Sequence, residues 1–228
     1  MLLGALAPLS THAQDTTDAL AATDILRLAS VQLAATQTVQ FALDVEGDTY
    51  IDSLKTLKLI EAKGDLVRPD RVQTEFKIEA LGQATISLQL IIVSGEWWTT
   101  DLITGKWGQA PVDFEYDPSV LFDSHDGIGP VMDRVTDAQR LEDQEIEDHN
   151  AFHIQALVDE SIIGDLTYNT LQGSPITVDL WIDKATNNVL RTRLAEPASV
   201  DDEDADDPAV WMLDLFDHGA DFTVDPPK

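Results

Sequence analysis

The 228-residue chain contains no cysteine, which excludes disulfide bonds, zinc–thiolate sites and thiol catalysis. It is also poor in basic residues, because 14 lysines and arginines stand against 42 aspartates and glutamates, for a formal net charge of −28. A surface this acidic repels phosphate backbones, so we expect no nucleic-acid partner. It also repels anionic lipid headgroups, except where basic residues gather locally.

Motifs that carry chemistry are missing as well. The sequence has no Gly-Xaa-Ser-Xaa-Gly element and no glycine-rich loop for phosphates or dinucleotides. His149 and His153 have the spacing of helical metal ligands, but they sit around a predicted hairpin and so do not share a helix face. Acidic residues are so numerous that carboxylate pairs arise by chance. We therefore expect no catalytic residues, no cofactor and no metal site.

No apolar stretch is long enough to span a membrane. The short apolar run at the start, followed by small and polar residues, is typical of the end of a signal peptide cut after Ala13. We predict a signal-peptide remnant over 1–13, a polar tether over 14–23 and a single domain over 24–228, with a mobile acidic loop at 196–208. This organisation predicts a secreted or cell-envelope protein, periplasmic or extracellular.

Within the domain, apolar and polar residues alternate with a period of two along several segments, which is typical of half-buried strands. The clearest of these segments are 39–45, 72–78, 86–92 and 176–182. One helix face instead carries an apolar stripe of Ile25, Leu28, Ala29 and Leu33, which predicts a helix from Asp24 with Thr23 or Asp24 as its cap. Shorter helices are predicted near Val120 and Val131.

Strands before and after a helical insert indicate an α+β fold and exclude a βαβ arrangement. A long sheet with one apolar face has to cover that face. We predict a strongly curved antiparallel sheet with helices on its concave face, enclosing an apolar cavity. Alternation alone favours a closed core, as in any sheet protein.

Five strings of sequence, by their order and spacing, resemble the LppX/LprG (LppX_LprAFG) lipoprotein family, whose half-barrel fold is shared with LolA and LolB. The strings are Val39–Gly47, Ala62–Asp70, Tyr116–Asp123 with Asp126–Gly129, Pro175–Asp183 and Asp217–Pro226. The resemblance implies a non-catalytic protein that binds acylated lipid or glycolipid and transfers it within the cell envelope. The family is usually anchored through an acylated cysteine, which this sequence lacks. The alternative is an extracellular adaptor or sensor-type domain with a closed core and a protein partner.

The expected ligand is a lipid or glycolipid with two or three acyl chains, carried by a monomer that contacts membranes transiently. The side chains expected to line its cavity are Val39, Phe41, Leu43, Val72, Phe76, Ile78, Leu88, Leu90, Ile92, Trp98 and Met132. The stretch 55–77 carries six basic and four acidic residues, a local balance of +2. We expect Lys58, Lys63 and Arg71 to contact a headgroup or membrane; ordinary charge mixing on exposed strands is the alternative.

Overall fold

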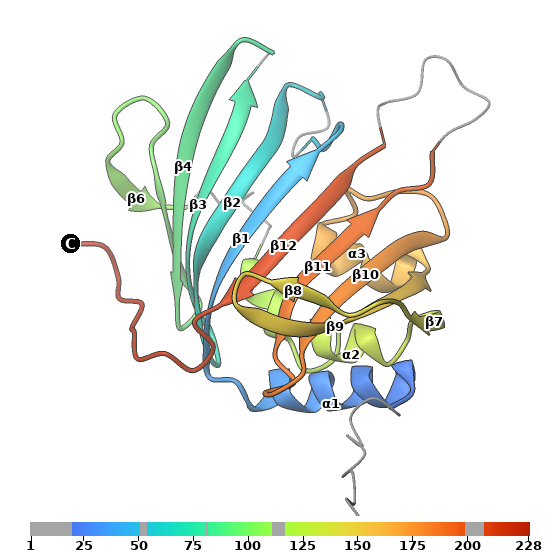
Figure 1. Ribbon diagram of the computed structural model, residues 1–228. Coiled ribbons are helices and arrows are strands. Elements are labelled where there is room, and N and C mark those ends of the chain that lie inside the picture. Colours follow the sequence, from blue (N-terminus) through green and yellow to red (C-terminus); the bar gives the residue numbers. More distant parts are fainter. Residues whose placement is uncertain (1–19, 51–53, 81, 111–116, 199–207) are drawn as a thin grey trace, which may run out of the picture.

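The computed structural model describes residues 20–50, 54–80, 82–110, 117–198 and 208–228. The predicted signal peptide and the acidic run 201–207 lie outside these ranges. Within them, antiparallel strands form a single 12-stranded sheet that is strongly curved and open (Figure 1). The strands are β1 (Thr38–Glu46), β2 (Leu57–Val67), β3 (Arg71–Ala80), β4 (Ala84–Val93), β5 (Glu96–Thr100), β6 (Trp107–Gln109), β7 (Thr136–Arg140), β8 (Gln144–Ile146), β9 (His149–Val158), β10 (Ile176–Asp183), β11 (Val189–Ala195) and β12 (Val210–Phe216).

The sheet order is β6-β5-β4-β3-β2-β1-β12-β11-β10-β9-β7, with β8 paired to β9 outside this path. The sheet therefore consists of two meanders, one formed by β1 to β6 and the other by β7 to β12. They meet at one seam, where β1 pairs with β12 over seven residue pairs from Gln40–Phe216 to Glu46–Val210. The α+β class and the large antiparallel sheet predicted from alternation are confirmed.

Alternation gives the sheet two distinct faces. We call the face that carries Val39, Phe41 and Leu43 the inner face; these side chains are buried, whereas their neighbours Gln40, Ala42 and Asp44 are only partly buried or exposed. Inner-face residues of both meanders belong to one continuous core cluster together with the helices. Two smaller clusters lie outside this core, one around Ile91, Val93 and Val224 and one around Trp181.

Helical elements share one core cluster with the inner face. They are α1 (Ala22–Ala35), the 3₁₀ helix η2 (Pro118–Phe122), α2 (Ile128–Met132) and α3 (Glu160–Thr167). In Figure 1, α1 crosses one end of the sheet, and α2 and α3 lie behind β9 to β11. The predicted apolar stripe of α1 is buried, but the predicted cap is wrong: the N-cap residue is Ala21, which has no side-chain capping bond. Burial of Ile25 and Ala29 fixes this helix without a cap.

Candidate functional site

An apolar cavity of about 70 Å³ lies between the inner face and the helices. Its wall combines both meanders with η2, α2 and α3, and no charged side chain of the described residues takes part. The lining residues are Phe41, Leu43, Ala62, Thr74, Phe76, Pro118, Leu121, Ile128, Val131, Met132, Val135, Ile163, Leu166, Thr167, Val178, Leu180, Thr192, Leu194, Trp211 and Leu213.

Strand register explains how the sheet side of this wall is built. Directly paired residues form a transverse row across six strands: Phe76, Ala62, Leu43, Leu213, Thr192 and Leu180. Every member of the row lines the cavity. The row crosses the β1–β12 seam, so the cavity exists only because the seam joins the two meanders.

Along the wall, burial is uneven. Leu43 and Leu180 are buried, whereas Leu194 and Leu213 are only partly buried. The partly buried pair lies on β11 and β12, so the cavity wall is more accessible at these strands than at β10.

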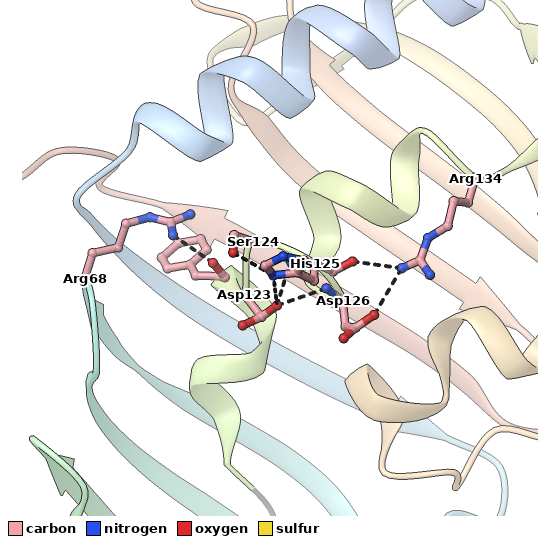
Figure 2. A network of polar contacts seen from close by, with 7 residues as sticks. Arg68, Asp123, Ser124, His125, Asp126 and Arg134 are labelled. Carbon is pink, nitrogen blue, oxygen red and sulfur yellow. Dashed lines mark hydrogen bonds and ion pairs between the residues drawn. The ribbon is translucent and has the colours of Figure 1, made fainter.

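Arg68, in the turn between β2 and β3, ties the helical side of the wall together (Figure 2). Its Nε donates to the carbonyl of Thr36 at 2.8 Å and its Nη2 to that of Leu33 at 3.2 Å, both at the C-terminal end of α1. Its Nη1 donates to the carbonyl of Phe122 at the end of η2, 2.7 Å away, and the guanidinium lies 4.8 Å from the centroid of the Phe122 ring. Burial lowers the pKa of Arg68 from its usual range. One cation thus joins α1, η2 and the β2–β3 turn.

The segment between η2 and α2 is fixed by a second set of bonds, also visible in Figure 2. Oδ1 of Asp123 accepts from the backbone N–H groups of His125 at 2.7 Å and Asp126 at 3.0 Å, and these bonds hold the pKa of Asp123 below its usual range. Arg134 then bonds the carbonyl of His125 at 3.3 Å and lies 3.7 Å from Asp126. These contacts position α2, which supplies Ile128, Val131 and Met132 to the cavity wall.

Three threonines are the polar side chains among the described lining residues. Oγ1 of Thr167 donates to the carbonyl of Ile163 at 3.1 Å, one helical turn earlier. Oγ1 of Thr74 and Oγ1 of Thr192 are buried and have no hydrogen-bond partner among the described residues. Trp211 shares the wall, and its Nε1 donates to Oγ1 of Thr49 at 3.2 Å.

The structure brings four of the eleven predicted lining residues into the cavity wall: Phe41, Leu43, Phe76 and Met132. Six more belong to the same core without lining the cavity, namely Val39, Val72, Ile78, Leu88, Leu90 and Ile92. Trp98 is placed differently, because it packs with Ile91 and Val93 in a cluster separate from the core around the cavity. Its neighbour Trp97 packs against the core instead, because consecutive strand residues face opposite ways.

The prediction omitted the C-terminal half of the wall. Val178 and Leu180 lie in a segment whose alternation is visible in the sequence, so their inward direction could have been inferred. Thr192, Leu194 and Leu213 carry no such local signal, since they join the wall through long-range pairing.

The three basic residues expected at a membrane lie apart, each beside an acidic group. Nζ of Lys58 lies 2.8 Å from Asp48, and Nζ of Lys63 lies 3.6 Å from Glu75. Arg71 donates to the carbonyl of Val224 at 2.8 Å and lies 3.7 Å from Asp225. Lys58 and Arg71 lie near opposite ends of the β2–β3 hairpin, as its register shows.

The histidines considered as metal ligands each pair with a different aspartate. Nδ1 of His149 lies 2.6 Å from Asp183, and Nε2 of His153 lies 2.9 Å from Asp179. Among the residues that the structure describes, no group of three or more histidine, aspartate or glutamate side chains could hold a metal ion. Within the same residues, none of the helices combines the length and the apolar character needed to cross a bilayer.

The chain is similar to proteins of known family and known structure. The family model described as "LppX_LprAFG lipoprotein" matches residues 21–224. The crystal structure of LprF from Mycobacterium bovis superposes with a TM-score of 0.69 at 18% identity, covering 90% of this chain and 96% of that one. LppX from Mycobacterium tuberculosis superposes with a TM-score of 0.62 at 14% identity, covering 93% and 100%. No curated protein matches the chain in sequence. At these identities the structural likeness establishes a shared fold.

Proposed function

Because this chain belongs to the LppX_LprAFG lipoprotein family, we propose that it binds an acylated lipid or glycolipid in the inner-face cavity and transfers it within the cell envelope. The observation that carries the proposal is the cavity wall, which joins both halves of the sheet to three helical elements and presents only apolar side chains and threonines. Each methylene buried there contributes about 0.8 kcal/mol, so chain length dominates the affinity.

The cavity must enlarge to take an acyl chain. At about 70 Å³ it is well below the roughly 300–1,000 Å³ of pockets that hold ligands of moderate size. The wall elements best suited to move are η2 and α2, which have five residues each and contact the sheet less than the strands contact one another. We propose that lipid enters as these two helices move away from the inner face of the sheet, with β11 and β12 as an accessible part of the wall.

Native mass spectrometry of protein purified without detergent, followed by organic extraction, tests the proposal. We expect a bound mass that extracts into the organic phase as a lipid with two or three acyl chains. The variant Leu213→Trp should carry less lipid and remain folded, because a partly buried wall position tolerates volume that a packed core does not. Leu102→Trp is the matched control, since Leu102 is half exposed in the β5–β6 loop, away from the cavity.

Absence of bound lipid, together with unchanged hydrogen exchange of η2 and α2 in the presence of vesicles, would refute lipid binding. The inner face would then be a closed core, and the adaptor or sensor-type function with a protein partner would stand in its place.

Delivery requires contact with a membrane, and we propose that a single protomer makes it transiently through Lys58, Lys63 and Arg71. Lys63 is the most exposed of the three, with 57% of its side chain accessible. Its acidic neighbour weakens the attraction of Lys63 to an anionic membrane. We therefore expect the three basic residues to raise the rate of lipid transfer at low salt. Lipid transfer from anionic vesicles should slow for the triple glutamine variant at low ionic strength and match wild type at high salt. Equal transfer rates of the variant and wild type at low salt would mean that these residues are ordinary exposed charges on the strands and do not contact the membrane.

A further inference from the structure

Two threonine hydroxyls in the cavity wall have no hydrogen-bond partner in the part of the chain that the structure describes. Thr74 on β3 is 1% exposed and Thr192 on β11 is 7% exposed, and neither Oγ1 has a hydrogen-bond partner among the described residues. Both residues line the cavity. A buried hydroxyl without a partner is destabilising, and native structures keep few of them. Two in one wall indicate a function other than folding.

The paired neighbours of each hydroxyl offer it no side-chain partner. Thr74 lies between Leu90 and Gly64 in the sheet, and these neighbours have no polar side-chain atom. Thr192 lies between Leu213 and Leu180, which are equally apolar.

Thr167 lines the same cavity, but its hydroxyl has a partner, because it donates a hydrogen bond to the carbonyl of Ile163. On the sheet, the backbone carbonyls are already engaged in strand pairing. A molecule inside the cavity can supply the missing partner.

The chemistry of the wall restricts that molecule. It must be mostly hydrocarbon to match the other lining side chains, and it must present hydrogen-bond acceptors. A free carboxylate is disfavoured, because no cationic side chain of the described residues lines the cavity to balance its charge. A neutral ester carbonyl satisfies all three conditions: it accepts a hydrogen bond, carries no charge and stands at the head of an acyl chain.

We propose that Thr74 and Thr192 donate hydrogen bonds to ester carbonyl oxygens of the bound lipid, so that the cavity selects acyl esters over ether-linked lipids of equal chain length. This proposal rests on the proposed lipid-binding function. The strands of the two threonines are separated by β2, β1 and β12, which places them up to about 19 Å apart along the sheet at 4.8 Å per strand. Each hydroxyl would therefore bind an ester carbonyl at a different place along the cavity.

The test compares two neutral probes in phosphatidylcholine vesicles: dioleoylglycerol, which has two ester carbonyls, and its dioleyl ether analogue, which has none. Lipid captured from vesicles holding both probes in equal amounts is extracted and quantified. We expect wild type to prefer the diester by about 3- to 10-fold, the value of a net hydrogen bond in a protein. Thr74→Val with Thr192→Val should remove the preference while retaining capture of the ether, because valine keeps the shape and removes the hydroxyl. The single variants assign the preference to one position or to both.

Thr36→Val is the matched control from outside the cavity wall, and its ester preference should equal that of wild type, because the buried hydroxyl of Thr36 already donates to the carbonyl of Gln32. Thermal unfolding of the lipid-free double variant should occur at or above the wild-type temperature, since two unpaired buried hydroxyls have been removed.

The outcomes separate the two proposals. If wild type captures neither probe, lipid binding itself fails. If wild type captures both probes equally, or if the double variant keeps the ester preference, lipid binding stands and the assignment of the hydroxyls is overturned.

Discussion

Replacement of Arg68 by methionine should destabilise the fold and loosen the helical wall of the cavity. Arg68 holds three carbonyls from α1 and η2 at 2.7–3.2 Å, and methionine retains the apolar stem while removing every donor. Two of these carbonyls lie in the last turn of α1, which has no basic residue of its own to complement the helix dipole. The substitution therefore leaves the ends of two helical elements without their shared partner.

The size of the effect follows from the type of bond. A hydrogen bond from a charged donor contributes about 1.5–3 kcal/mol, and bonds that share one side chain are not additive. Because Arg68 is only partly buried, water replaces part of what is lost. We expect a loss of about 2–4 kcal/mol in the free energy of unfolding. With a urea dependence of about 2 kcal/mol per molar, the unfolding midpoint should fall by about 1–2 M.

Urea unfolding of both forms, followed by tryptophan fluorescence, measures this loss. Arg27→Met is the matched control, because Arg27 is 62% exposed and lies 3.8 Å from Asp24 in a surface ion pair on the same helix. Its loss should stay below about 0.5 kcal/mol. A change of less than 1 kcal/mol for Arg68→Met would refute the view that this cation joins the helices, and hydrogen exchange of η2 would then be unchanged as well.

Three further predictions concern stability. Gly64→Ala should lower the unfolding midpoint in urea by at least 1 M or prevent folding, because a Cβ there would lie 2.0 Å from the carbonyl oxygen of Gln73; a midpoint within 0.3 M of wild type would contradict this. Burial lowers the pKa of His218, so the unfolded chain takes up its proton first and stability should fall as the pH drops below about 6.5; His218→Gln should lose this component between pH 8 and pH 5.5, and an identical pH profile would contradict it. The backbone bonds that lower the pKa of Asp123 stabilise the fold above the unfolded pKa of 3.8 and are lost as the pH falls through the folded value, so acid unfolding of Asp123→Asn should show a shallower dependence on pH below 4 than wild type.

Local patterns located several elements of the fold. Alternation at 39–45, 72–78 and 176–182 located β1, β3 and β10, because a period of two persists wherever one face of a strand is buried. The stripe beginning at Ile25 located α1 in the same way. The family resemblance, now supported by a match over residues 21–224, implied the half-barrel fold.

The cavity was harder to predict, because its wall depends on pairing that no local pattern records. Trp97 and Trp98 are chemically identical neighbours, so the sequence could not decide which one faces the core. Leu213 enters the wall because β12 pairs with β1, more than 160 residues away in the chain. The unpartnered hydroxyl of Thr192 was equally hidden, because a threonine in a strand carries no sign of what lies opposite.

The seam between β1 and β12 also affects how the chain folds during its synthesis. The first meander is complete once the ribosome has passed β6, yet β1 keeps an open edge until the last of the strands has been made. During that interval the edge can pair with any extended chain, including another copy of the protein. Joining strands so distant in sequence is slow, since the loop must close before any pair is gained. We expect a chain cut before Val210 to keep that edge exposed and to aggregate more readily than the intact chain.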